Sequence, residues 1–359
     1  MNSVAKINLN HLVSNINYLQ SKINSSEIYP VIKSNAYGHG AIEVAKIVSK
    51  NSIKTVCVAT KKEILEILNA ELGLDVFHLG KINLCKQSIS KKVVFTINSL
   101  SDIDYINSKC REQDCKIRCH IKVDTGMGRL GCSMYDFNKI FKLAIKSEFI
   151  ILEGIYSHLS CADDKKSDYN QKQIDKFNFI INEVKGFDLK FHLLNSAGIF
   201  NYNTYSYDFV RSGLAIYGIS PISKLDKNLK PVMEFSAPVV LLKDINKGDK
   251  IGYGCTFCAK KNMKVAIIQC GYADGIPIDF SNNGYVFYDK FKFPIIGRVS
   301  MDLICIDITS FKGETKIDKV VIWGGENKHS RLEYIAKNFN TIPYVYLTGI
   351  TNRVEREYV

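Results

Sequence analysis

Residues 55–71 read TVCVATKKEILEILNAE, a short β-branched run followed directly by a stretch in which apolar residues recur at spacings of three and four. The first pattern is typical of a buried strand, and the second is typical of a helix with one apolar face. The stretch therefore predicts a strand followed by a helix, the unit from which parallel sheets are built.

The same alternation continues along the chain up to about residue 215. Strand-like runs lie at residues 28–32, 55–60, 75–79, 92–96, 117–123, 149–157, 190–194 and 209–210, and helical patterns between them include 61–71, 101–112, 134–147 and 169–184. Eight such strands predict an α/β fold, a (β/α)8 barrel of the TIM type, with its chemistry at the C-terminal ends of the strands. A doubly wound open sheet is the alternative.

The pattern changes after residues 229–231. Short β-branched runs at 237–242, 264–269, 284–287, 293–296, 303–308 and 320–323 are separated by Gly, Asp and Asn, and one helical pattern covers 331–339. This predicts a mostly β, largely antiparallel second domain. We divide the chain into a barrel domain, residues 1–225, and a β-rich domain, residues 226–359.

The composition is that of an ordinary globular protein, with 359 residues, 46% of them hydrophobic and 23% charged. It excludes a disordered or collagen-like chain. The 48 Lys and Arg against 36 Asp and Glu give a net charge of +12. That charge leaves a polyanionic partner open, although a lysine-rich composition produces it equally well.

Cysteine usage and the absence of targeting signals predict a cytoplasmic protein without disulfides or a bound metal. The eleven Cys are scattered, and Cys255 with Cys258 forms a lone C-x-x-C that lacks the second pair of a structural zinc site. The first ten residues have no apolar core of a signal peptide. No stretch of about 18 apolar residues is available to span a membrane.

Lys33 stands at the end of the first predicted barrel strand. At the mouth of a barrel, burial disfavours the ammonium ion, lowers the pKa of the lysine and makes its amine a nucleophile for a carbonyl group. Judged by position alone, a strand-end lysine in contact with water is the commoner case.

Polar residues at other strand ends favour the functional interpretation. They are Lys122 at the fifth strand, His158 at the sixth, Asn195 and Ser196 at the seventh, and Arg211 and Gly213 at the eighth. Brought together at one barrel mouth, they predict a pocket for an anionic ligand. The hydroxyl of Ser196 and the backbone amides near Gly213 suit a phosphate group.

Residues 126–131, GMGRLG, match the G-x-G-x-x-G pattern of dinucleotide-binding proteins. In those proteins the pattern joins the first strand of a βαβ unit to its helix. Here it follows the fifth strand, after four βα units, so we interpret the match as accidental.

Seven segments carry a resemblance that covers nearly the whole chain. They are VIKSNAYGHG (31–40), KVDTGMGRLG (122–131), EGIYSHLS (153–160), NSA (195–197), VRSGLAIYG (210–218), GYADG (271–275) and GRVSMD (297–302). In this order and at this spacing they resemble the pyridoxal-phosphate-dependent alanine racemases of fold type III. The resemblance implies a barrel followed by a β domain, pyridoxal 5'-phosphate as cofactor, and interconversion of L- and D-alanine, which supplies D-alanine for peptidoglycan.

The resemblance also implies two acid/base residues on opposite faces of the substrate α-carbon. Lys33 is expected to hold the cofactor as a Schiff base and to act on one face, and Tyr272 is expected to act on the other. In the family this tyrosine comes from the second subunit, which implies a homodimer with shared active sites.

Further roles around the cofactor follow from the same resemblance. Arg211 is expected to face the pyridine nitrogen, which stays unprotonated because a guanidinium has only donors. His158 is expected to lie beside Tyr272 and to interact with Arg211. Arg129 is expected near the phenolic oxygen and the substrate carboxylate, and Lys122 matches a position that is carbamylated in many members. The other implied contacts are Tyr37, Asn195, Ser196, Gly213 and Leu214 with the cofactor, and the backbone amide of Met301 with the substrate.

Two positions depart from the family pattern. Asn352 stands where many members carry a tyrosine that narrows the pocket, and Ser300 replaces a common cysteine, for which we expect little effect. The shorter Asn352 predicts room for a hydroxymethyl side chain, so a serine or broad-specificity racemase is the alternative function. A role of Asn352 in the phosphate contact alone is the competing interpretation.

Two alternatives of other classes are a barrel-type pyridoxal-phosphate decarboxylase and a protein that only holds the cofactor. Neither gives Tyr272 a role. With an anionic cofactor and a carboxylate substrate implied, the basic charge requires no nucleic acid, and most of it is left to the lysine-rich composition.

Overall fold

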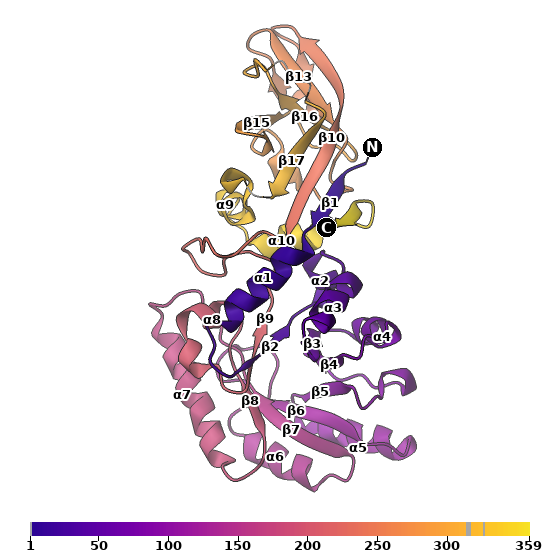
Figure 1. Cartoon of the computed structure of the whole chain (residues 1–359), viewed down its shortest axis with the longest axis vertical. Coiled ribbons are helices and arrows are strands. Elements are labelled where there is room, and N and C mark those ends of the chain that lie inside the picture. Colours follow the sequence, from indigo (N-terminus) through magenta and orange to yellow (C-terminus); the bar gives the residue numbers. More distant parts are fainter. Residues whose placement is uncertain (1, 314–316, 326) are drawn as a thin grey trace.

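The computed structural model describes residues 2–313, 317–325 and 327–359. Figure 1 shows two bodies stacked along the long axis of the molecule, with the first part of the chain in the lower body and most of the last third in the upper one. One continuous apolar core extends through both bodies.

Eight parallel strands form the lower body. They are β2 (Glu27–Pro30), β3 (Thr55–Val58), β4 (Asp75–His78), β5 (Val93–Ile97), β6 (Ile117–Lys122), β7 (Ile150–Tyr156), β8 (Lys190–His192) and β9 (Phe209–Ser212). Strands β3 to β8 pair in sequence order, and β2 pairs with β9. A parallel bridge from Val31 to Cys57 joins β2 to β3. Arg211 N donates to Leu194 O at 3.0 Å and links β9 to the end of β8. The strands thus close into the predicted (β/α)8 barrel, and the doubly wound sheet is excluded.

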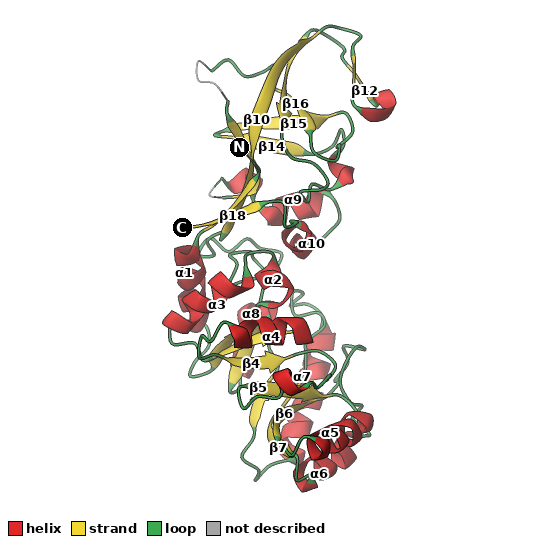
Figure 2. Cartoon of the chain, turned by 90° about the vertical axis from the view of Figure 1, so that its right-hand side faces the viewer, coloured by secondary structure: helices red, strands yellow, loops and turns green. Residues whose placement is uncertain are grey.

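Helices cover the outside of the barrel (Figure 2). They are α1 (Leu9–Gln20), α3 (Ala41–Lys50), α4 (Lys61–Asn69), α5 (Leu100–Glu112), α6 (Phe137–Lys146), α7 (Asp168–Glu183) and α8 (Ser196–Asn201). The short α2 (Lys33–Tyr37) lies at the C-terminal end of β2. Thr60 and Glu63 form a capping box that starts α4, as a Thr followed three residues later by Glu favours. After β4 the chain forms only a short 3-10 turn, η1 (Lys86–Ser88), in place of an α-helix.

The upper body is the predicted, largely antiparallel β domain. Its elements are β10 (Met233–Ile245), β11 (Lys250–Ile251), β12 (Phe257–Cys258), β13 (Met263–Ile268), β14 (Tyr285–Tyr288), β15 (Phe291–Ile296), β16 (Ile304–Asp307), β17 (Lys319–Gly324), α9 (Leu332–Asn338), α10 (Pro343–Gly349) and β18 (Glu355–Tyr358). The sheet runs β13-β16-β15-β14-β17-β10-β1-β18, and the long strand β10 also pairs with β13. This second pairing curls the sheet around its core.

The first strand, β1 (Val4–Ile7), lies in the sheet of the β domain although it precedes the barrel in the chain. It pairs antiparallel with β10 and parallel with β18. The first and the last strand of the chain are therefore neighbours in the sheet of the upper body, and Figure 1 shows the C-terminus near the base of that body and the N-terminus higher beside the sheet.

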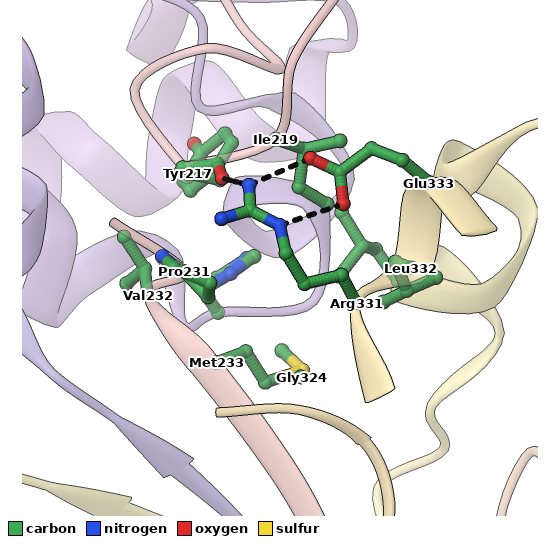
Figure 3. Close-up of a pocket in the computed structure, with 12 residues that line it drawn as sticks. Tyr217, Ile219, Pro231, Val232, Met233, Gly324, Arg331, Leu332 and Glu333 are labelled. Atoms are coloured by element: carbon green, nitrogen blue, oxygen red, sulfur yellow. Dashed lines mark hydrogen bonds and ion pairs between the residues drawn. The ribbon is translucent and has the colours of Figure 1, made fainter. Parts of the chain in front are cut away.

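An ion pair between a buried arginine and a partly buried glutamate fastens the connection between the two bodies (Figure 3). Arg331 Nη2 contacts Glu333 Oε1 at 2.7 Å and donates to Gly218 O at 2.9 Å. Glu333 in turn accepts from Ser220 N at 2.9 Å. The start of α9 thereby binds the segment that leaves the barrel.

Three further properties concern the described residues. No helix there is long and apolar enough to cross a membrane. No group of three or more His, Cys, Asp and Glu in that part is arranged to hold a metal ion. The eleven cysteines are all unpaired thiols.

Candidate active site

The strand-end residues singled out in the sequence lie at one mouth of the barrel. Lys33 follows β2, Lys122 ends β6, His158 follows β7, Asn195 and Ser196 follow β8, and Arg211 lies in β9. Because all eight strands are parallel, their C-terminal ends face the same side, where barrels of this type carry their chemistry.

Lys33 begins a left-handed helical turn, the most unusual backbone feature of the site. Ser34, Asn35, Ala36 and Tyr37 have φ between 50° and 54°. This handedness costs roughly 1–2 kcal/mol for each residue with a side chain. Such a run of strained residues persists only where surrounding contacts hold it in place.

Side chains from three places hold this turn. Ser34 N donates to Glu63 Oε1 at 2.6 Å, and Ala41 N donates to Asn35 Oδ1 at 2.8 Å. His39 Nδ1 lies 2.9 Å from Ala36 O and 3.0 Å from Tyr37 O. Because both partners are carbonyls, Nδ1 carries the hydrogen and donates it.

His39 is buried, and its burial lowers its pKa to about 4, so the ring stays neutral. Its Nε2 has no hydrogen-bond partner among the described residues. The residue lines a cavity of about 10 Å³ beside Tyr217 and Arg331, shown in Figure 3. That volume is close to the smallest that holds one water molecule.

The mouth of the barrel is strongly positive. Burial, followed by the charge of Arg129, lowers the pKa of Lys33. Burial and then the charges of Arg211 and Arg129 lower the pKa of Lys122 to about 8. Both amines are therefore more easily deprotonated than an exposed lysine, and the site favours an anionic ligand.

Arg211 is buried in a network of acceptors. Its Nη2 donates to Ser157 O at 2.7 Å and contacts His158 Nδ1 at 3.2 Å, and its Nη1 binds His192 Nδ1. A guanidinium has only donors, so both imidazoles accept through Nδ1. Burial, and secondly the charge of Arg211, lowers the pKa of both histidines well below the usual value.

Hydroxyl groups and backbone amides meet at the ends of β8 and β9. Ser196 Oγ accepts from Gly213 N at 3.0 Å and from Ala215 N at 3.3 Å. A Cβ atom on Gly213 would lie 2.6 Å from the Tyr37 hydroxyl. The N–H of Leu214 makes no hydrogen bond to another described residue. These groups suit a phosphate group, and the amine of Lys33 suits a carbonyl carbon.

A single carboxylate organises the loop that carries Arg129. Asp124 Oδ1 accepts from the backbone of Gly126, Met127 and Gly128 at 2.9, 2.7 and 3.2 Å, and Oδ2 accepts from Arg129 N at 3.2 Å. Partial burial opposes ionisation, but these N–H groups lower the pKa of Asp124 overall. No helix follows this loop directly, since α6 begins at Phe137.

Tyr272 and Met301 lie in the β domain and are largely exposed, with 42% and 51% of their surface accessible. The backbone joins them, because Tyr272 N donates to Ser300 O and Ala273 N donates to Met301 O. In the described part of the chain, neither makes a hydrogen bond to the barrel mouth. Asn352 is exposed in the turn before β18. Within one chain, the predicted barrel residues therefore gather at the mouth, whereas Tyr272, Met301 and Asn352 do not join them.

Several residues of the site were not singled out from the sequence. Glu63, His39 and Asp124 act on backbone groups and were given no role, although Glu63 has capping-box spacing from Thr60 and the other two lie in the quoted segments 31–40 and 122–131. His192 is the last residue of β8, but the strand was predicted to continue to residue 194, so the strand-end rule pointed to Asn195 and did not find His192.

Fold and site together define a class, the barrel proteins that bind a phosphate-bearing carbonyl compound on a lysine at the barrel mouth. Comparison with known proteins identifies the family. Residues 7–221 match the N-terminal domain of alanine racemase, and residues 232–358 match its C-terminal domain. The chain belongs to the alanine racemase family.

Individual relatives agree over their full length. Alanine racemase 2 of Caldanaerobacter subterraneus is 35% identical over 99% of this chain and 94% of its own, and alanine racemase of Sorangium cellulosum is 34% identical over 99% and 98%. Alanine racemase from Bartonella henselae, with covalently bound pyridoxal phosphate, has a TM-score of 0.91 at 31% identity and covers both chains completely. The names of these relatives favour alanine over the serine or broad-specificity alternative.

Proposed function

We propose that this protein is an alanine racemase that uses pyridoxal 5'-phosphate to interconvert L- and D-alanine. The observation that carries the proposal is the position of Lys33, on a left-handed turn at the barrel mouth, with Arg129, Lys122 and Arg211 around it. When bound, the cofactor withdraws electrons from the substrate α-carbon and makes its proton acidic. The chain contributes to the D-alanine supply for peptidoglycan and acts in the cytoplasm.

Lys33 holds the cofactor covalently and moves a proton on one face of the α-carbon. Its lowered pKa supports both tasks, because a neutral amine is required for attachment and for accepting a proton. Tyr272 moves the proton on the opposite face. Two groups are needed because a single group on one face would return the proton where it was removed.

The remaining barrel residues bind and orient. Arg211 would donate to the pyridine nitrogen, while Ser157, His158, His192 and Leu193 hold its Nη1 and Nη2. Tyr37, Asn195, Ser196, Gly213 and Leu214 bind the cofactor around its phosphate. Arg129 and the backbone of Met301 bind the substrate carboxylate.

Lys122 is a carbamylated lysine in this proposal. Carbon dioxide reacts with a neutral amine, and burial lowers the pKa of Lys122 to about 8, which increases the neutral fraction at neutral pH. As a carbamate, the residue carries a negative charge that orients Arg129. Asn352 contributes to the phosphate contact at the edge of the pocket.

The active unit is a homodimer with shared sites. Tyr272 and Met301 project from the β domain and are exposed, while the lysine and the phosphate cradle lie in the barrel. A second copy of the chain supplies the tyrosine that the barrel mouth lacks. The division at residues 225 and 226 separates a cofactor-binding domain from a domain that serves the partner, although β1 (Val4–Ile7) lies in the sheet of the second domain.

Mixed dimers test this function and the sharing of sites together. Lys33→Ala and Tyr272→Phe chains are each expected to lose racemisation, and Tyr272→Phe is expected to keep the absorbance of the bound cofactor. After mixing and exchange of subunits, half of the dimers combine one chain of each kind, and each such dimer contains one intact site. We expect about a quarter of wild-type activity to return.

The control is each variant alone, treated identically. Absence of recovery in samples shown to have exchanged subunits would contradict shared sites. Full activity of Tyr272→Phe alone would contradict the two-base assignment.

A further inference from the structure

Arg356, in β18, binds backbone carbonyls on both sides of the junction between the barrel and the β domain. Its Nε donates to Gly38 O at 2.8 Å, and its Nη1 donates to Val354 O at 3.1 Å and Thr351 O at 3.3 Å. Its Nη2 donates to Ile350 O at 3.3 Å. In the described part of the chain no carboxylate pairs with this guanidinium. Its donors are thus committed to the main chain.

On the barrel side, Arg356 binds the end of the left-handed turn. Gly38 terminates that turn with φ of 82°. A Cβ atom on Gly38 would lie 2.2 Å from Leu347 O, and one on Gly40 would lie 1.9 Å from the Tyr358 hydroxyl. The C-terminal segment of the chain therefore packs directly against the backbone that carries Lys33.

On the other side, one of the three carbonyls that Arg356 binds belongs to Thr351, whose side chain contacts the loop of Tyr272. Thr351 Oγ1 donates to Ala273 O at 2.7 Å, and Thr351 N donates to Asp274 O at 3.4 Å. Ala273 directly follows Tyr272. A continuous series of contacts thus runs from Gly38 through Arg356 and Thr351 to the tyrosine loop.

We propose that Arg356 is a positioning residue that holds the turn of Lys33 and, through Thr351, the loop of Tyr272 in one geometry. This rests on the proposed function, which assigns the two acid/base roles. Because Lys33 serves its own chain's site and Tyr272 serves the partner's, one guanidinium orients groups in both sites of the dimer. The rigid five-donor fork of arginine suits four carbonyls, whereas the single nitrogen of lysine does not.

The competing explanation is that Arg356 only fastens the two domains together. In that case its loss lowers stability and leaves cofactor affinity and catalysis unchanged in the folded fraction. The two explanations therefore differ in readouts that are independent of the amount of folded protein.

The experiment compares Arg356→Gln and Arg356→Lys with the control Arg111→Gln, an exposed arginine on α5. Three quantities are measured on purified dimers: the dissociation constant of pyridoxal 5'-phosphate by absorbance titration, the thermal midpoint, and kcat with the α-deuterium isotope effect from each enantiomer. For Arg356→Gln we expect cofactor binding weaker by about tenfold or more, and a lower kcat with a larger isotope effect in both directions. Arg356→Lys is expected to fall between Arg356→Gln and wild type.

The variant Thr351→Val tests the contact with the Tyr272 loop separately from the contact between Arg356 and Gly38. It removes the hydroxyl that binds Ala273 O and leaves the carbonyl that binds Arg356 in place. We expect unchanged cofactor affinity and a larger isotope effect only in the direction in which Tyr272 removes the proton. If Arg356→Gln fails to fold, Arg356→Lys, which keeps a cation at the junction, provides the test of Arg356 itself.

Wild-type cofactor affinity and isotope effects in Arg356→Gln, with only a lower thermal midpoint, would overturn the proposal. If Thr351→Val changed the isotope effect by the same factor in both directions, or in neither, the proposed influence of Thr351 on Tyr272 would be wrong. Failure of the proposed function is distinguishable from failure of this proposal. If the proposed function is wrong, the wild-type chain shows no racemisation. The cofactor titration still measures the effect of Arg356 on the Lys33 turn.

Discussion

At the scale of single residues, the site depends on backbone geometry that ordinary side chains avoid. The residues that follow Lys33 have positive φ, and they are held by Glu63, His39 and Asn35. Lys33 is thus positioned by a turn that has little rotational freedom left. A rigid attachment of this kind favours catalysis, because a base must lie within hydrogen-bond reach of the proton that it removes.

Gly213 provides a prediction at this scale. Substitution to Ala places a Cβ atom 2.6 Å from the Tyr37 hydroxyl, so the tyrosine must shift within the proposed phosphate site. We expect Gly213→Ala to weaken pyridoxal 5'-phosphate binding by about tenfold. Absorbance titration measures the dissociation constant.

The matched control is Gly349→Ala, since no atom lies within 4 Å of the added methyl group there. Equal cofactor affinity in the two variants would show that Tyr37 and Gly213 do not form the cradle.

At the scale of elements, the loop after β6 shows how one side chain can organise a functional segment. Residues 126–129 have no regular structure, and the four N–H groups that they present converge on Asp124. Arg129 is the last residue of this set, so Asp124 anchors the backbone of the residue that we propose binds the substrate carboxylate.

We predict that Asp124→Ala raises the KM for alanine by about tenfold or more, because the four amides lose their acceptor and Arg129 loses its anchor. Asp124→Asn keeps one carbonyl oxygen and is expected to have a smaller effect. Steady-state kinetics with both enantiomers measure KM and kcat. Asp104→Ala, at an exposed position on α5, is the control, and a KM increase of the same size there would argue against a specific role of Asp124.

At the scale of the whole molecule, burial of neutral histidines makes stability depend on pH. Burial lowers the pKa of His39 to about 4 and of His120 to about 3, and it also lowers those of His78, His158 and His192. In the unfolded chain a histidine binds a proton near pH 6.5. Because the unfolded state takes up protons first as the pH falls, the free energy of unfolding decreases from about pH 6.5 toward pH 4.

His39→Asn isolates one of these contributions. The Asn amide retains a donor near the position of Nδ1, but it does not titrate. For the cofactor-free protein we expect the slope of unfolding free energy against pH, between about pH 6.5 and 4, to decrease by about 1.4 kcal/mol per pH unit relative to wild type. Urea unfolding at a series of pH values measures this slope. His329→Asn, at an exposed position, is the control. A slope equal to that of wild type would contradict a neutral, buried His39.

Much of the architecture was predictable because its signals are local. Each of the eight predicted barrel strands overlaps an observed one, and the helix expected at 61–71 is α4 (Lys61–Asn69). Strand β1 was not predicted, because four residues whose partners lie more than 200 positions away carry no distinctive pattern. Helix α10 was missed as well, although Pro343 at its first position is a typical start signal.

The amino-acid sequence by itself determined the alternation of strands and helices, the family, and the residue types at the barrel mouth. These depend on hydrophobic periodicity and on short motifs, which act between near neighbours. Only the tertiary structure decided the left-handed sense of the turn after Lys33, the protonated nitrogen of His39 and the role of Arg356. Each of these depends on contacts that burial enforces, and Arg356 and Gly38 are 318 positions apart. No local pattern specifies a hydrogen bond between residues so distant, because it forms only when the folded domains bring donor and acceptor together.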